Sequence, residues 1–188
     1  MSRTPIGTDA VTKTPAKGDF ITFYDISDSN KPRKATIQDI RQVSGGVVSV
    51  TDASVTLDAD THAGKIVVLN RAAGVTVTLP AATATGDVYT IVIGTAATSN
   101  ANIIQTSATT EHMTGSLRGV DDDVEGATGY QWNAETNDDT VTMNGTSTGG
   151  KAGDTIVIRD YESTNFTVDG YITQSGGSEA TPFSAAVS

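Results

Sequence analysis

Short runs in which apolar and polar residues alternate recur along the chain, and they predict β-strands. The first run covers residues 19–24. From residue 47 onward six more follow closely, separated by residues typical of turns. These runs are VVSV (47–50), SVTLDA (54–59), GKIVVLN (64–70), GVTVTLP (74–80), DVYTIVI (87–93) and NIIQT (102–106). We expect these six strands to form a small sandwich or barrel.

Four later runs continue the pattern. They are GYQWNA (129–134), DTVTMN (139–144), DTIVIRDY (154–161) and NFTVDGYIT (165–173). Among all the runs, GKIVVLN is continuous enough in apolar residues to predict a strand buried on both faces. No repeat of a solenoid period appears.

The first 46 residues differ from this body. Residues 1–18 are rich in Thr, Pro and Lys and show no apolar period, so we expect an extended N-terminal arm. After the first strand, Pro32 predicts a polar turn, because proline cannot continue a strand ladder. Thr36 with Asp39 resembles a capping box, and predicts one short helix of about two turns that ends at the following glycines.

The predicted fold class is therefore all-β, a sandwich or barrel-like β body preceded by an extended N-terminal arm and one short helix. The parts are the arm at 1–18, a strand and short helix at 19–46, and the β-rich body at 47–188. Residues 108–153 are more acidic and richer in Gly than the rest of the body. This change leaves two alternatives open, a soft division near 108–114 or one fold that the later strands complete.

Composition strengthens the all-β prediction. The chain of 188 residues contains 31 Thr, 18 Val and 13 Ile, but only four Leu. Such β-branched side chains lose rotamer freedom in a helix and pack well on a pleated sheet. A chain of this length can bury a substantial core.

Charge is divided unevenly along the chain. Residues 1–41 hold seven basic and five acidic residues, a net charge of +2, whereas residues 42–188 hold five basic and seventeen acidic residues, a net charge of −12. An acidic body repels nucleic acid, so we expect no nucleic-acid partner. The basic excess has two interpretations, a solvated tail or a segment that docks onto another protein surface.

The chain has no cysteine, which excludes disulfides and thiolate metal sites. It also lacks a hydrophobic signal region and any apolar run approaching the roughly 18 residues that a membrane span needs. We therefore expect a protein that is made and folded in a cytosol and has no membrane partner.

Two glycine-rich motif matches around Ser147 fail on context. GTSTG (145–149) has the spacing of a hydrolase nucleophile elbow, but a strand-like run follows it and both histidines, His62 and His112, precede it. The same stretch nearly spells a phosphate loop, yet Ala152 replaces the hydroxyl residue that ligates magnesium. A glycine-rich hairpin tip explains these residues better.

Metal and sugar-cleaving sites are not predicted either. DDDVEG (121–126) resembles the start of a calcium loop, but the twelfth position, which needs a bidentate Glu, is Trp132. A looser oxygen site and a solvated acidic loop remain alternatives there.

Sugar-cleaving sites usually stack the ring on aromatic residues, and the chain has one Trp. We therefore expect no catalytic residues, no cofactor and no metal, and a structural protein rather than an enzyme.

Two stretches resemble structural proteins of tailed bacteriophages. GDFITFYDISDSNKPRKATIQDI (18–40) is similar to the N-terminal segment of many virion proteins, in which a strand ending in Tyr-Asp precedes a polar turn and a short helix. Residues 62–106 resemble a β module of head-decoration (cement) proteins and of some fibre proteins, through GKIVVLN, RAAG, VTVTLPAA and YTIVIGT. From the length of this chain we expect no fibre shaft with a receptor-binding head.

This resemblance implies a capsid decoration protein on the outer surface of the virion, made in the bacterial host cytoplasm. Such a protein binds the major capsid protein as a homotrimer and stabilises contacts between capsid subunits. The alternative is a short head or tail fibre or adaptor that binds a host surface or another virion protein. The residues expected at the capsid or trimer contact are Arg3, Lys13, Lys17, Phe20, Phe23, Tyr24, Lys31, Arg33 and Lys34. For the aromatic residues, an ordinary first strand of the core stays open as the other interpretation.

Overall fold

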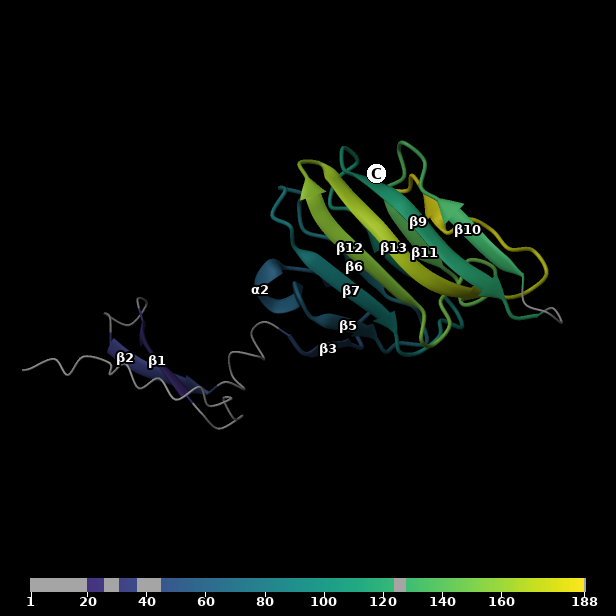
Figure 1. Ribbon diagram of the computed structural model, residues 1–188. Coiled ribbons are helices and arrows are strands. Elements are labelled where there is room, and N and C mark those ends of the chain that lie inside the picture. The colour runs from purple at the N-terminus through teal and green to yellow at the C-terminus, as the bar shows by residue number, and fades with distance from the viewer. Residues whose placement is uncertain (1–19, 26–30, 37–44, 124–127, 188) are drawn as a thin grey trace, which may run out of the picture. The chain divides into compact units, whose positions relative to one another are not determined.

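A computed structural model of the chain describes residues 20–25, 31–36, 45–123 and 128–187. It divides into two compact units, Met1–Val43 and Ser44–Ser188. Figure 1 labels the two described strands of the first unit and most of the strands of the second. The soft division that the sequence left open near 108–114 falls inside the second unit.

The described part of the first unit is a two-stranded antiparallel sheet. Strand β1 (Phe20–Asp25) lies where the sequence predicted it, and β2 (Lys31–Thr36) pairs with it along its whole length. The prediction of a turn at Pro32 was therefore wrong. A strand in a two-stranded sheet has one unpaired edge, so it tolerates a residue without an N–H. The predicted short helix falls mainly on residues 37–44, outside the described residues.

The second unit is a β-sandwich with one short helix among its described residues. Its elements are β3 (Val47–Val50), β4 (Ser54–Thr56), α2 (Ala59–His62), β5 (Ile66–Leu69), β6 (Thr76–Thr78), β7 (Val88–Ile93), β8 (Asn102–Gln105), β9 (His112–Asp121), β10 (Gly129–Asn133), β11 (Thr140–Met143), β12 (Thr155–Glu162), β13 (Asn165–Gln174) and β14 (Phe183–Ser184). All ten strands predicted in the body are present.

Two open sheets make up this sandwich. The larger has the strand order β10-β9-β13-β12-β7-β5-β3, and the smaller has the order β14-β11-β8-β6-β4. Figure 1 shows the larger sheet in front, with β6 and β11 of the smaller sheet behind it. Because each sheet ends in edge strands, the body is a sandwich and not a closed barrel. The all-β prediction is confirmed.

Strands β3 to β8 alternate between the two sheets as the chain proceeds. In the larger sheet β3, β5 and β7 are parallel neighbours, and in the smaller sheet β4, β6 and β8 are parallel neighbours. Each pair of strands therefore resembles one coil of a parallel solenoid. The sequence showed no repeat, because the links between the strands differ in length and composition.

Strand β9 was missed by the sequence analysis. It runs for ten residues, paired antiparallel with β10 and parallel with β13. Two glycines weaken its strand signal, but both are needed there. A Cβ at Gly115 would lie 2.0 Å from the Val168 carbonyl oxygen, and one at Gly119 would lie 1.8 Å from the Ile172 carbonyl oxygen. The close approach of β13 therefore requires glycine at these positions.

The core lies between the two sheets. Alternate residues of β5, β7 and β12 are buried there, and the residues between them face outward. The prediction that GKIVVLN is buried on both faces was wrong, since Ile66 is 43 % exposed. Within the body the smaller sheet covers one face of the larger sheet, so an apolar run on the larger sheet need not be buried on both faces.

Candidate functional site

The predicted contact residues gather partly in the N-terminal hairpin. Phe20, Phe23 and Tyr24 belong to β1, and Lys31, Arg33 and Lys34 belong to β2. Arg3, Lys13 and Lys17 lie outside the described residues.

The register of this hairpin intersperses aromatic and basic positions. Phe23 pairs with Arg33, Tyr24 with Pro32, and Asp25 with Lys31. Lys34 is exposed. Six residues that are spread over fifteen positions in the sequence therefore share one small two-stranded sheet.

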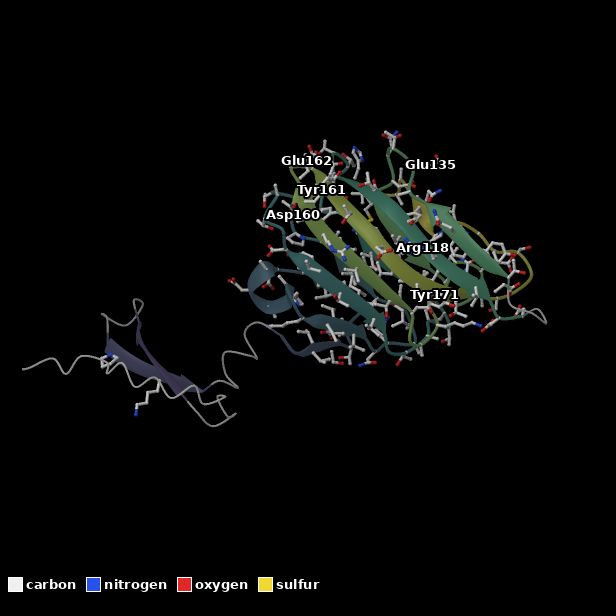
Figure 2. All side chains as sticks on the ribbon, viewed as in Figure 1. Arg118, Glu135, Asp160, Tyr161, Glu162 and Tyr171 are labelled. Carbon is white, nitrogen blue, oxygen red and sulfur yellow. The ribbon has the colours of Figure 1, made fainter. Side chains whose placement is uncertain are left out.

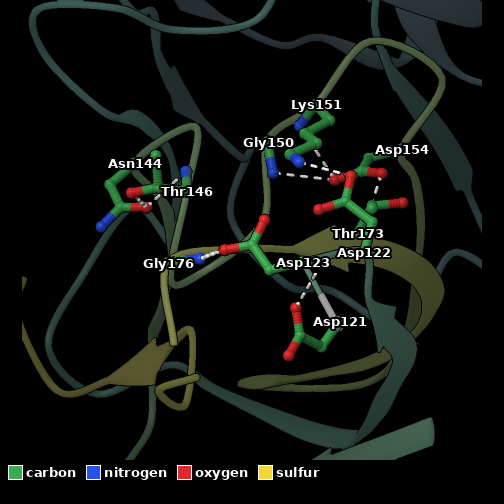
Figure 3. A network of polar contacts seen from close by, with 10 residues as sticks. All are labelled: Asp121, Asp122, Asp123, Asn144, Thr146, Gly150, Lys151, Asp154, Thr173 and Gly176. Atoms are coloured by element: carbon green, nitrogen blue, oxygen red, sulfur yellow. Dashed lines mark hydrogen bonds and ion pairs between the residues drawn. The ribbon is translucent and has the colours of Figure 1, made fainter. Parts of the chain in front are cut away.

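In the body, three consecutive carboxylates lie at the end of strand β9 and just after it (Figure 3). Asp121, Asp122 and Asp123 each offer an oxygen, and these oxygens lie within 4.8 Å of one another. Each carboxylate already has a partner in the chain. Asp121 accepts a hydrogen bond from the Asp123 N–H, Asp122 forms an ion pair with Lys151, and Asp123 accepts one from the Gly176 N–H. These contacts support a role in joining loops, and the looser oxygen site stays a prediction.

Next to this cluster, the carboxylate of Asp154 organises the glycine-rich turn (Figure 3). Asp154 is buried and accepts hydrogen bonds from the N–H groups of Gly150, Lys151 and Thr173, at 2.8, 3.0 and 2.9 Å. Burial raises the pKa of Asp154, although these hydrogen bonds act in the opposite direction. The acid therefore fastens a loop to β13.

Ser147 lies in that same glycine-rich segment, where the nucleophile and phosphate-loop matches were found. Its hydroxyl oxygen accepts a hydrogen bond from the Asn144 side-chain amide at 3.0 Å, and strand β12 follows instead of a helix. The side-chain oxygen of Asn144, Oδ1, in turn accepts hydrogen bonds from the N–H groups of Thr146 and Thr148. The hydrogen bonds are those of a compact turn, but the prediction of a hairpin tip was wrong, because β11 before this segment and β12 after it belong to different sheets.

A cleft lies beside edge strand β10, where the sequence analysis expected no site. It has a volume of about 320 Å³ and is lined by Trp132, Asn133, Glu135, Asp138, Thr181 and Phe183. A second hollow of about 720 Å³, lined by residues 134–138 and Ala185, shares Glu135 and Asp138 with it. Residues of β10, of the turn that follows and of the C-terminal segment therefore meet around one concave surface.

The aromatic side of this cleft is built by the register of β10. Trp132 pairs with Leu117 of β9, which is fully buried, so the indole is directed toward the core side of the sheet. Because β10 is the edge strand, the indole is only partly covered. Tyr130, two residues earlier on the same face, stacks on it with a centroid distance of 5.6 Å and an interplanar angle of 23°.

The electrostatics of the cleft are negative. Asp138 is buried and accepts a hydrogen bond from the Glu135 N–H at 2.7 Å, while Glu135 itself is exposed. Partial burial, and then the nearby carboxylates of Glu179 and Asp121, raise the pKa of the Tyr130 hydroxyl. Two acids and one aromatic stack can bind a neutral or cationic molecule more readily than an anion.

Trp132 packs against the core. What the sequence analysis missed is that the C-terminal segment, some fifty residues later, supplies the other wall. The available signal was the composition of GYQWNAETNDD, in which aromatic, amide and carboxylate side chains lie close together.

None of the helices among the described residues is long and apolar enough to cross a membrane. The sequence matches no known protein-family model, and no curated protein is significantly similar to it.

Proposed function

We propose that the chain is a phage capsid decoration protein, which binds the major capsid protein on the outside of the head as a homotrimer and stabilises contacts between capsid subunits. One observation carries most of the argument. The chain divides at Val43/Ser44 into a small unit and a large one, and this division coincides with the change of net charge from +2 to −12. A separate basic segment ahead of an acidic body is what an attachment segment requires.

The hairpin supplies chemistry that suits attachment. Its ladder combines three aromatic and three basic residues, the types that form the apolar anchors and the electrostatic complement of protein interfaces. Aromatic side chains contribute binding energy through buried area, and the basic ones select an acidic or mixed partner surface. The major capsid protein is the proposed partner.

Trimerisation multiplies the strength of this attachment. Three attachment segments on one trimer turn weak single contacts into avidity, with a gain on the order of 10² or more. A trimer that contacts neighbouring capsid subunits resists their separation under pressure from the packaged genome. The mechanism involves no turnover, no cofactor and no metal.

The acidic body suits the outward position. Its net charge of −12 keeps copies apart in solution and repels nucleic acid. The described Lys and Arg residues of the body number five, and two of them are paired with carboxylates, Lys151 with Asp122 and Arg118 with Asp169.

Charge reversal in the hairpin tests the proposal. The triple variant Lys31→Glu, Arg33→Glu and Lys34→Glu replaces three positive charges by three negative ones, so binding of the purified protein to stripped capsids should fall by at least tenfold. Co-sedimentation with capsids measures the binding. The matched control reverses two body residues, Lys65→Glu and Arg159→Glu, and should bind as the wild type does. Equal binding by the hairpin variant and the wild type would contradict the proposal.

A short head or tail fibre or adaptor, which binds a host surface or another virion protein, is the second candidate. The cleft beside β10 favours it, because a concave aromatic and polar surface suits ligand recognition more than shell attachment. Copy number separates the two functions. Quantitative mass spectrometry of purified particles should find hundreds of copies for decoration and a handful for a fibre or adaptor.

A further inference from the structure

The cleft beside β10 combines one aromatic surface with a polar rim. Trp132 and Phe183 contribute the apolar part, and Asn133, Glu135 and Thr181 contribute amide, carboxylate and hydroxyl groups. These residues come from β10, the following turn and the C-terminal segment, so folding is needed to bring them together.

The aromatic surface is held in place before any ligand arrives. Trp132 stacks on Tyr130 and packs against the core, while the partial exposure of its indole leaves it accessible from the cleft. A fixed indole loses little rotamer freedom on binding, which favours affinity. Trp132 is also the single tryptophan of the chain.

Polar groups at the rim are available to a ligand. Among the described residues, neither the Trp132 indole N–H nor the Glu135 carboxylate has a hydrogen-bond partner, and the Asn133 side chain uses only its oxygen, which accepts from Gln131 at 2.8 Å. The Thr181 hydroxyl oxygen accepts a hydrogen bond from the Phe183 N–H, and its hydroxyl hydrogen can be donated to a ligand. The cleft therefore offers both donors and acceptors beside an aromatic face.

We propose that this cleft binds a neutral saccharide. A sugar ring presents C–H groups on one face, which suit an indole surface, and hydroxyl groups around its edge, which both donate and accept hydrogen bonds. Several simpler ligands fit less well. An anion meets two acidic side chains and no basic one in the lining, and a metal ion meets indole and amide donors as well as carboxylates.

The size of the concave surface indicates a chain of sugars. The cleft of about 320 Å³ and the hollow of about 720 Å³ share Glu135 and Asp138 in their linings. A single sugar fills only part of this space. A surface polysaccharide and a free oligosaccharide share this chemistry, so the length of sugar chain that binds best separates the two sources. The inference goes beyond the decoration role and does not depend on it.

Titration of the purified full-length protein with sugars tests the inference, with the fluorescence of Trp132 as the signal. The probes are glucose, mannose and N-acetylglucosamine as single sugars, and cellotriose, maltotriose, mannotriose and chitotriose with their hexamers. We expect a saturable change with at least one neutral oligosaccharide in the millimolar range or below. Tighter binding of the hexamer than of the trimer indicates a polysaccharide source, and equal binding indicates a free oligosaccharide.

Variants locate the binding in the cleft, with calorimetry as the readout because fluorescence is lost with Trp132. Trp132→Ala should weaken binding by about tenfold or more. If Trp132→Ala does not fold, Glu135→Lys serves instead, because Glu135 is an exposed turn residue whose side chain has no hydrogen-bond partner among the described residues. It should weaken binding to a similar extent.

Two exposed residues elsewhere on the body serve as matched controls, and Figure 2 labels them together with Glu135. Tyr171 is 51 % exposed and pairs with Arg118, on the opposite face of the larger sheet from Trp132, and Glu162 ends β12. Tyr171→Ala and Glu162→Gln should bind as the wild type does. The inference fails if no probe gives a saturable change up to about 50 mM or if Glu135→Lys binds normally. None of these outcomes bears on capsid attachment.

Discussion

In the two halves of the sandwich, backbone N–H groups outside the strands find their hydrogen-bond acceptors in different ways. In residues 45–106 the coils follow one another in parallel, and backbone hydrogen bonds between coils extend past the strand ends, as from the Leu57 N–H to the Thr78 carbonyl and from the Leu79 N–H to the Gln105 carbonyl. In residues 107–187 several loop N–H groups, among them those of Gly150, Lys151 and Ala186, donate hydrogen bonds to buried carboxylates instead.

The distribution of buried carboxylates makes this difference concrete. Among the described residues every buried carboxylate belongs to the second half. They are Glu111, Asp121, Asp138, Asp139, Asp154 and Asp160. The acidity of the body is thus partly internal, and six of its seventeen acids act as acceptors for backbone groups rather than as solvating surface charges.

Two of these acids hold a loop of the first half. Glu111 accepts a hydrogen bond from the Ala82 N–H at 2.7 Å, and Asp160 accepts from the N–H groups of Thr83, Ala84 and Thr85. The second half therefore clamps the loop between β6 and β7. Because the pKa of Asp160 is lowered, we infer that this acid makes the stability of the sandwich dependent on pH.

The largest expected loss of stability comes from a core substitution in the first half of the sandwich, residues 45–106. Leu69 is fully buried on β5, so Leu69→Ala should lower the free energy of unfolding by about 2–5 kcal/mol. Urea denaturation at several pH values measures it. The loss should be the same at pH 4 and pH 7, because no titrating group is removed. A loss of stability that changes with pH would contradict the view that only the buried acids of residues 107–187 make stability depend on pH.

A smaller effect is expected where β9 and β13 approach each other. Gly119→Ala places a methyl group against the Ile172 carbonyl oxygen and should cost about 1–3 kcal/mol of stability. Gly129→Ala on the neighbouring strand is the matched control, since its nearest atom lies 4.0 Å from the added Cβ. Thermal unfolding compares the two variants. Equal stabilities would mean that the glycines of β9 are not needed for strand pairing.

The smallest effect is expected at Asp160, and it should depend on pH. Burial favours protonation, but the hydrogen bonds from Thr83, Thr85 and Ala84 outweigh it and lower the pKa of Asp160 below its ordinary value. The ionised acid therefore stabilises the fold above the unfolded pKa of about 3.9, and this contribution is lost as the pH falls through the lower folded pKa.

Asp160→Asn should cost about 1 kcal/mol at pH 7, since one acceptor oxygen remains. The difference from the wild type should shrink as the pH falls below about 4. Denaturation curves between pH 2.5 and 7 check this, with the exposed Glu162→Gln as control. A difference that stays constant over this range would show that the acid acts through shape and not through charge.

Prediction from the sequence succeeded where a signal is local. Alternation along DVYTIVI and DTIVIRDY placed β7 and β12 within one or two residues, because the side chains of a strand alternate between its faces every second residue. It failed at β2, where Pro32 predicted a turn, and at β9, where the glycines weaken the alternation and no strand was predicted. Pro32 is tolerated because each strand of a two-stranded sheet has one unpaired edge. The glycines of β9 are required because the neighbouring strand β13 approaches closely.

The cleft shows the same limit for function. Aromatic, amide and carboxylate residues near Trp132 were visible in the sequence, but a single tryptophan in an acidic stretch predicts no site by itself. Thr181 and Phe183 complete the cleft from the far end of the chain. The nine predicted contact residues have a different status, since six are placed in the hairpin and three lie outside the described residues.

The sequence by itself determined the all-β class, the position of most strands and the division of charge between a basic leader and an acidic body, because these properties depend on neighbouring residues and on composition. Only the tertiary structure decided which strands pair, which acids are buried and where a concave surface forms. The physical reason is that hydrogen-bond partners and close approaches join residues that are distant in the sequence, so no local pattern records them.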